Sequence, residues 1–192
     1  HSISKEYKIK NLCLAGGVAL NCVANGKILK EKIFENIWVQ PAAGDAGGSL
    51  GAALALWHID FGKERNEIFE DNMNCSYLGP EYSNEEIKNI LIEIGANFRS
   101  LSKDELLNFT VENLIKGSAI GWFQGKMEFG PRALGNRSII GDARLPDMQK
   151  KLNLKVKFRE SFRPFAPSVL LEDLSEWFDL KTESPYMLMV GK

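Results

Sequence analysis

The sequence predicts an α/β fold in its first part and an α+β arrangement in its second. Within residues 1–61, an apolar strand, a glycine loop and a helical pattern follow one another twice. A polar and charged stretch comes next, and we expect residues 62–75 to form a linker. In residues 76–192, two amphipathic helical patterns precede strand-like segments and a basic region. Two regions with apolar patterns of their own, separated by a polar stretch, are typical of two domains.

The first part contains the two strand–loop–helix units. Apolar residues predict strands at residues 8–15 and 37–39. One helical pattern extends from residue 18 towards residue 32. The glycine loop 44–48 opens a second helix, rich in Ala and Leu, that runs through Leu56. In α/β sheets, ligands bind at loops that follow the carboxyl ends of strands. Both glycine loops are therefore candidate ligand loops.

The second part begins with two helices whose N-termini carry capping signals. Ser83 with Glu86, and Ser102 with Glu105, form Ser-x-x-Glu capping boxes, and apolar residues follow each pair at helical spacing. Gly117 is expected to end the second helix. The remaining expected elements are strands at residues 119–123, 138–141 and 165–170 and a helix at residues 147–153.

The composition is that of an ordinary globular protein, with 44% hydrophobic residues, 26% charged residues and a net charge of −1. No run approaches the roughly 18 apolar residues of a membrane span. Cys13, Cys22 and Cys75 are odd in number and lack C-x-x-C spacing, which argues against a disulfide framework or a zinc ribbon. We expect free thiols in a reducing cytoplasm. Because the first residue is not Met, we expect the chain to begin inside a longer protein.

The two glycine loops have residue types that suit an anion and a metal. Gly16 and Gly17 lie between a strand and a helix, where the backbone can approach a phosphate, although a tight turn without a ligand is the alternative. Asp45 lies in the loop 44–48 at a helix start, where it either caps the helix or directs its carboxylate at a metal. Neither loop has the P-loop or dinucleotide pattern. Together they suggest two walls of one nucleotide cleft, with Asp45 facing it.

The basic charge of the chain is concentrated in residues 123–163, which contain ten Lys or Arg against four Asp or Glu. Guanidinium groups on turns bounded by Gly and Pro favour a local phosphate or carboxylate site over a nucleic-acid surface, and solvated side chains are the alternative. We expect one anion pocket to be formed by Lys126, Arg132, Arg137 and Arg163. Glu128 and Glu160 are the nearest carboxylates in sequence and are expected to pair with some of these arginines in the absence of a ligand.

Four sequence patterns together resemble one enzyme family. They are L-A-G-G-V-A-L-N-C (14–22), G-D-A-G-G-S-L-G-A-A (44–53), F-Q-G-K-M-E-F-G-P-R-A-L-G-N-R-S (123–138) and F-R-P-F-A-P (162–167). The chain resembles the O-carbamoyltransferases of nodulation and antibiotic biosynthesis. The resemblance covers residues 11–57 and 121–167. It implies the end of an actin-like α/β domain in residues 1–61 and the first part of an α+β YrdC-like domain in residues 76–192.

The resemblance implies a reaction in two steps. In this family the YrdC-like domain uses carbamoyl phosphate and ATP, with Mg²⁺, to make a carbamoyl adenylate. The actin-like domain then transfers the carbamoyl group to a hydroxyl of a small molecule or sugar, assisted by a divalent metal that is expected to be Fe²⁺. Neither a nucleic acid nor a membrane is implied as a partner, and a homodimer stays open.

The resemblance also implies roles for individual residues. The catalytic residues that it implies, which would bind phosphate groups, are Lys126, Arg132, Arg137 and Arg163. The residues that it implies for substrate or nucleotide binding are Gly16, Gly17, Asn21, Ser138 and Arg159. Asp45 is implied to ligate the metal.

The chain departs from the family pattern in two ways. Its only histidines are His1 and His58, and neither lies in the motif that supplies the family's metal-binding histidines. The family's YrdC-like domain also continues past the point that corresponds to Lys192. We therefore expect a chain that is cut at both ends and that performs no carbamoyl transfer alone.

Three other interpretations stay open. A hydrogenase-maturation carbamoyltransferase would bring an acylphosphatase region and paired C-x-x-C motifs, which this segment lacks. A tRNA threonylcarbamoyl-modifying protein shares both domain types, but the run F-G-P-R-A-L-G-N-R-S argues against it. A non-catalytic nucleotide-binding module would keep the glycine loops without needing the clustered arginines.

Overall fold

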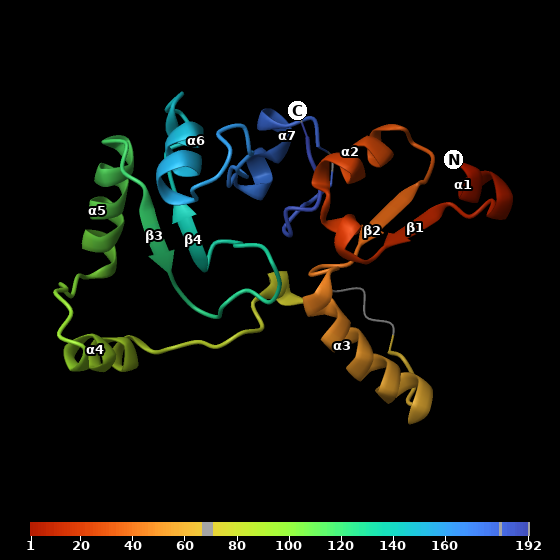
Figure 1. The fold of residues 1–192 in the computed structure, drawn as a ribbon, viewed down its shortest axis with the longest axis horizontal. Helices are drawn as coiled ribbons and strands as arrows, with labels where there is room; N and C mark the ends of the chain where they lie inside the picture. Colours follow the sequence, from red (N-terminus) through yellow and green to blue (C-terminus); the bar gives the residue numbers. More distant parts are fainter. Residues whose placement is uncertain (67–70, 181, 192) are drawn as a thin grey trace. The chain divides into compact units, whose positions relative to one another are not determined.

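The computed structural model describes residues 1–66, 71–180 and 182–191 as a mixed α/β protein with helices and two small sheets (Figure 1). The chain folds into two compact units. The first unit comprises His1–Gly79, Glu128–Leu134 and Val169–Lys192, and the second comprises Pro80–Met127 and Gly135–Ser168. The first unit thus collects segments that are far apart in the sequence. The domain boundaries expected from the sequence, 1–61 and 76–192, stay a prediction.

The first unit contains a parallel pair of strands. β1 (Asn11–Leu14) pairs with β2 (Asn36–Val39), with Asn11 opposite Asn36 and Leu14 opposite Val39. Both strands were expected from the apolar runs, although each is short. Because the pair is parallel, the two glycine loops that follow the strands begin at the same edge of the sheet.

The single helical pattern expected from residue 18 towards residue 32 is divided in two. A 3₁₀ turn (Gly17–Leu20) is followed by α2 (Cys22–Lys30). The division falls at Asn21, whose side-chain Oδ1 accepts a hydrogen bond from Ala24 N at 3.1 Å. Asn favours this N-cap role because its side chain satisfies a helix N–H that has no partner within the helix.

The other elements of the first unit are short apart from α3. The structure places them at α1 (Ser2–Tyr7), α3 (Asp45–Ala55) with a π-helical turn (Leu56–Asp60), 3₁₀ turns (Asn74–Ser76 and Leu171–Asp173) and α7 (Leu174–Trp177). The helix predicted after the second glycine loop is therefore present. No helix in the described ranges is long and apolar enough to cross a membrane.

The core of the first unit contains residues from both ends of the chain. Its buried apolar residues are Ala19, Val39, Ala43, Tyr186 and Leu188. Asn25, which is also buried, donates from Nδ2 to the carbonyl oxygens of Ala19 at 2.8 Å and Leu188 at 3.0 Å. The segment around residues 186–188 therefore packs beside the residues that follow the first glycine loop.

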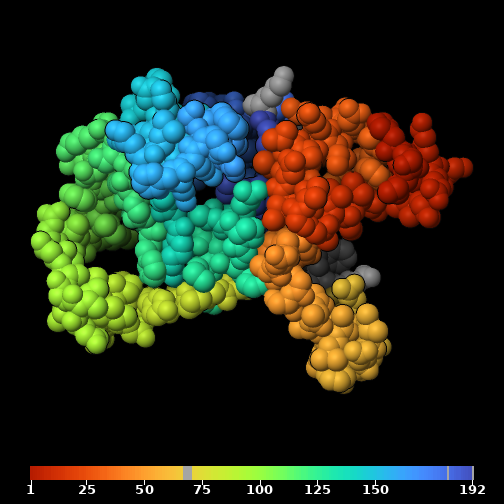
Figure 2. All heavy atoms as spheres, in the orientation of Figure 1, coloured from red at the N-terminus to blue at the C-terminus, as the bar shows by residue number. Residues whose placement is uncertain are grey.

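The second unit contains two capped helices and an antiparallel strand pair. α4 (Asn84–Glu93) and α5 (Lys103–Ile115) begin with the predicted capping boxes, and neither helix contains a buried residue. The surface of both can be followed in Figure 2 as the yellow-green to green stretch. β3 (Ile120–Phe123) pairs antiparallel with β4 (Arg137–Ile140), and α6 (Met148–Lys151) continues into a π-helical turn (Leu152–Val156).

The strand expected at residues 165–170 is wrong. These residues have no regular secondary structure. Pro164 and Pro167 flank or interrupt the apolar run, and proline has no N–H to donate to a strand ladder. The apolar composition of the segment therefore gave a misleading strand signal.

Two neighbouring glycines of α3 provide a test of this packing. A Cβ added at Gly47 would press against the carbonyl oxygen of Ala42, whereas one added at Gly48 would meet nothing within 4 Å. Gly47→Ala should therefore lower the free energy of unfolding by about 1–3 kcal/mol through overpacking. Gly48→Ala should raise it by up to about 1 kcal/mol, because Ala loses less backbone entropy in a helix.

Denaturant unfolding of both variants measures this difference. Equal effects of the two substitutions would contradict the close approach of Gly47 to the Ala42 carbonyl.

Candidate functional site

The first unit has a pocket between the two glycine loops. Its volume is about 440 Å³, and it is lined by Gly17, Leu20, Gly44, Asp45, Ala46, Gly130 and Pro131. The loops are joined by a hydrogen bond from Gly16 N to the carbonyl oxygen of Ala43 at 2.8 Å. The pocket therefore lies where the carboxyl ends of the two parallel strands lead, as expected for a ligand site of an α/β sheet.

Asp45 is the first residue of α3 and contributes to the pocket wall. The N-cap position belongs to Gly44, and no side-chain hydrogen bond caps the helix. The Asp45 side chain is exposed and lines the same pocket as Gly17. The structure thus brings the two glycine loops and Asp45 together. The roles of Gly16, Gly17 and Asp45 in binding nucleotide and metal stay predictions.

Residues 128–134 supply the third side of this pocket. Gly130 has a φ of +116°, and a Cβ at this position would lie 2.7 Å from the Ala42 Cβ, so only glycine fits. Phe129 N donates to the carbonyl oxygen of Ser76 at 2.6 Å, and Leu134 N donates to Glu128 Oε1 at 2.7 Å. Sequence reasoning did not assign this segment to the glycine-loop pocket. The close approach of Gly130 to Ala42 joins two residues that are far apart in the sequence.

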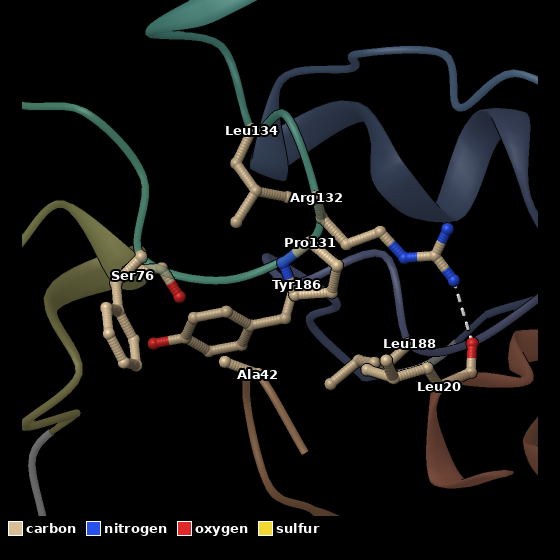
Figure 3. A pocket seen from close by; sticks show the side chains of 9 residues that line it. Leu20, Ala42, Ser76, Pro131, Arg132, Leu134, Tyr186 and Leu188 are labelled. Atoms are coloured by element: carbon tan, nitrogen blue, oxygen red, sulfur yellow. Dashed lines mark hydrogen bonds between the residues drawn. The ribbon is translucent and has the colours of Figure 1, made fainter. Parts of the chain in front are cut away.

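Arg132 is held within the first unit. Its Nη2 donates to the carbonyl oxygen of Leu20 at 2.8 Å, at the end of the 3₁₀ turn that follows the first glycine loop. Figure 3 shows this bond beside a small pocket whose lining includes Tyr186 and Leu134. The Arg132 Nε is buried and has no hydrogen-bond partner among the described residues. Arg132 therefore has one buried N–H donor without an acceptor in the described part of the chain.

A left-handed turn forms the opposite side of the small pocket in Figure 3. Asn74, Cys75 and Ser76 have φ angles of 46°, 54° and 65°, a conformation that side chains with a Cβ rarely adopt in succession. The Tyr186 hydroxyl donates to the Asp71 carboxylate and accepts from Cys75 N. Burial and the Asp71 carboxylate raise the pKa of Tyr186. The turn is thus held by a tyrosine from the other end of the chain.

The guanidinium of Arg137, in the second unit, donates hydrogen bonds to backbone carbonyl oxygens. Its two Nη atoms donate four hydrogen bonds, of 2.6–3.3 Å, and its guanidinium lies 3.5 Å from the centre of the Phe123 ring. The four acceptors are the carbonyl oxygens of Pro80, Gln124, Gly125 and Asn136. Arg137 therefore fixes the loop on which Lys126 lies.

Ser138 and Lys126, two further residues of the predicted site, have different surroundings. The Ser138 hydroxyl accepts from Gly135 N at 2.9 Å, which tightens the turn before β4. The Lys126 side chain is exposed, and within the described ranges its ammonium has no ion-pair or hydrogen-bond partner. Lys126 is the cation of this loop that is available to a ligand.

Arg159 and Arg163 lie on the turn after the π-helical segment and are held through their Nε atoms. Arg159 Nε donates to Asn153 Oδ1 at 2.7 Å, and Arg163 Nε donates to Glu160 Oε2 at 2.8 Å. The hydrogen bond from Arg163 lowers the pKa of Glu160. Among the residues that the structure describes, the Nη atoms of both arginines have no hydrogen-bond partner. The expected pairing of Glu160 with an arginine is confirmed.

The structure distributes the predicted cationic residues over both units. Arg132 belongs to the first unit, and Lys126, Arg137 and Arg163 belong to the second. Their convergence on one anion pocket stays a prediction. Sequence reasoning missed Asn153, which is fully buried beside Arg159. A polar residue between Leu152 and Leu154 was the available signal.

Comparison with known proteins identifies the family. Residues 1–54 match the family model described as carbamoyltransferase N-terminus, and residues 111–192 match the one described as carbamoyltransferase C-terminus. The chain belongs to the carbamoyltransferase family. The glycine loops and Asp45 lie in the part that matches the N-terminal model, and the predicted cationic residues lie in the part that matches the C-terminal model.

Three relatives indicate how much of a carbamoyltransferase the chain represents. It is 55% identical, over its whole length, to an uncharacterized protein of Synechocystis, of which it covers 31%. Over 95% of its length it is 45% identical to nodulation protein NolNO of Sinorhizobium fredii, of which it covers 27%. Over 92% of its length it is 44% identical to nodulation protein NolO of Bradyrhizobium diazoefficiens, of which it covers 32%. The chain thus spans less than a third of the length of these relatives.

The residues of this carbamoyltransferase segment fit the two expected metals unequally. Mg²⁺ is commonly held by one or two carboxylates together with substrate phosphates, and Asp45 at a glycine-loop pocket fits that arrangement. Iron(II) sites usually need several His and carboxylate ligands. No group of three or more His, Cys, Asp or Glu side chains that could hold a metal occurs in the described part of the chain. The described residues therefore do not by themselves fit an Fe²⁺ site.

The carbonyl contacts of Arg137 lead to a stability prediction. Arg137→Lys should lower the free energy of unfolding by about 1–3 kcal/mol, because a lysine ammonium cannot replace the planar fork that reaches four carbonyls. Arg144→Lys is the control, since Arg144 pairs on the surface with Asp142 two residues away. Urea denaturation of both variants in the full-length protein measures the effect. If Arg137→Lys is no less stable than the control variant, the structural role of Arg137 is refuted.

Proposed function

We propose that the full-length protein that contains this chain is an O-carbamoyltransferase that works in two steps. It forms a carbamoyl adenylate from carbamoyl phosphate, water and ATP, with release of inorganic phosphate and pyrophosphate, on a YrdC-like domain to which the second unit contributes. It then transfers the carbamoyl group to a hydroxyl of a small molecule or sugar, with release of AMP, at an actin-like domain to which the glycine-loop pocket contributes. Membership of the carbamoyltransferase family supports the proposal broadly.

The observation that carries the proposal is the hydrogen bonding of the Arg159 and Arg163 guanidinium groups. Each guanidinium is positioned by its Nε, while its Nη atoms have no hydrogen-bond partner in the described part of the chain. A guanidinium that already makes one hydrogen bond to the protein loses less side-chain entropy when it binds a phosphate. Transfer of phosphoryl and adenylyl groups depends mainly on such fixed positive charge.

The glycine-loop pocket has the features that the transfer step requires. A volume of about 440 Å³ is within the usual range for small-molecule sites. Glycines allow the backbone to approach a phosphate closely, and α3 begins at Asp45, which lines the same pocket. When bound, a divalent metal would supply charge neutralisation to phosphate oxygens, and Asp45 would be one of its ligands.

A non-catalytic nucleotide-binding module is the competing interpretation, and catalysis distinguishes the two. The full-length protein is expected to consume ATP in the presence of carbamoyl phosphate, and to carbamoylate an acceptor from a panel of sugars and hydroxylated small molecules. ATP binding without any consumption of carbamoyl phosphate would refute the proposal.

The arginine turn leads to the corresponding mutational prediction. Arg163→Ala should weaken carbamoyl phosphate binding at least about tenfold, since a charge-assisted hydrogen bond contributes roughly 1.5–3 kcal/mol. Isothermal titration calorimetry on the full-length protein measures this change. Arg144→Ala is the control, because Arg144 is an exposed arginine of the same unit that is paired with Asp142. Unchanged affinity in Arg163→Ala would remove Arg163 from the phosphate site.

A further inference from the structure

A single buried amide lies behind the turn that carries Arg159 and Arg163. Asn153 is 0% exposed and lies in the π-helical turn after α6. Its Nδ2 donates to the carbonyl oxygens of Ser161 at 3.1 Å and Arg163 at 2.8 Å. Its Oδ1 accepts from Arg159 Nε at 2.7 Å. One side chain therefore contacts both arginine residues.

The orientation of this amide is determined by its partners. Nδ2 has two hydrogens, and each has a carbonyl acceptor, while Oδ1 faces a guanidinium that can only donate. The opposite orientation would place the amide oxygen against two carbonyl oxygens and the amide hydrogens against Arg159. No other side chain of similar size offers two donors and an acceptor at this geometry, because Asp has no hydrogens to donate and Leu has no polar atoms.

The turn depends on such side-chain bonds because it has little regular structure of its own. Residues 163–170 form neither helix nor strand. The backbone adds two bonds, from Arg159 N to the carbonyl oxygen of Asn153 at 3.0 Å and from Arg163 N to the carbonyl oxygen of Glu160 at 3.3 Å. Gln149 Nε2 donates to the Arg163 carbonyl oxygen at 3.0 Å, and the Arg159 guanidinium lies 5.0 Å from the centre of the Phe165 ring. Asn153 is the only one of these groups that reaches both arginine residues.

We propose that Asn153 is a positioning residue for phosphate binding. It fixes the Arg159 side chain through Nε and the Arg163 backbone through the carbonyl, and it leaves the Nη atoms of both available to the phosphate of carbamoyl phosphate. The inference rests on the proposed function, since that function supplies the ligand. Losing the amide removes the bond that holds the Arg159 side chain and one of the bonds to the Arg163 carbonyl at the same time. The effect on affinity should therefore exceed that of losing one ordinary hydrogen bond.

The test compares two buried asparagines of the full-length protein. Asn153→Asp keeps the size of the side chain and an acceptor for Arg159, but it removes both donors. Asn25→Asp is the matched control, because Asn25 is 2% exposed and also donates from Nδ2 to two carbonyl oxygens, within the first unit. Both substitutions should lower the melting temperature. Only Asn153→Asp should weaken carbamoyl phosphate binding, at least about tenfold by calorimetry, and raise its KM more than it lowers kcat.

A milder variant covers the case in which Asn153→Asp does not fold. Gln149→Ala removes an exposed donor to the Arg163 carbonyl and should weaken carbamoyl phosphate binding about two- to fivefold with the melting temperature unchanged. If Asn153→Asp folds and its affinity for carbamoyl phosphate is unchanged, the inference is overturned. If Asn153→Asp does not fold, unchanged affinity in Gln149→Ala overturns it. Equal weakening in Asn25→Asp also overturns it, since the effect would then follow general loss of stability. A wild-type protein that binds no carbamoyl phosphate overturns the proposed function together with the inference.

Discussion

Backbone carbonyl groups in irregular segments need hydrogen-bond donors when they are withdrawn from water, and much of this structure depends on how they find them. Short strands and helices leave much of this chain without a hydrogen-bonded ladder, and a buried carbonyl without a partner is costly. The donors come from side chains that carry several N–H groups. Asn25 and Arg132 serve the first unit in this way, and Arg137 and Asn153 serve the second. Asn25, Arg132 and Asn153 join segments that no strand or helix connects, and Arg137 holds the loop next to the β3–β4 pair.

The same constraint separates the arginines into two groups. Arg132 and Arg137 donate from their Nη atoms to carbonyl oxygens and so hold loops in place. Arg159 and Arg163 are held through Nε, by an amide and a carboxylate, and their Nη atoms have no protein partner in the described residues. A guanidinium has five N–H donors in a fixed fork, so the face that the protein occupies determines which face a ligand can use. Arginines that look equivalent in sequence therefore have different hydrogen-bond partners in the structure.

The glycine-loop pocket brings together the two parts of the family pattern. Its floor comes from Gly17 and Asp45, which lie in the part that matches the N-terminal family model, and its wall comes from Gly130 and Pro131, which lie in the part that matches the C-terminal one. The wall can approach because Gly130 has no Cβ to meet Ala42. A glycine is needed at this position because a backbone segment that is distant in the sequence lies close to it.

Features that depend on neighbouring residues could be predicted from the sequence. The capping boxes at Ser83 and Ser102, the helix end before Gly117 and the strands that precede the glycines at 16–17 and 44 all follow from local patterns, and the structure has them. Features that depend on contacts between distant residues could not be predicted in this way. Apolar content predicted a strand at residues 165–170, but this segment, which contains Pro167, is irregular, and the buried Asn153 bonds to the carbonyl oxygens of Ser161 and Arg163 in the turn before it. The acceptors of a guanidinium or an amide are chosen by which carbonyls folding brings within about 3 Å, and no local spacing encodes that choice.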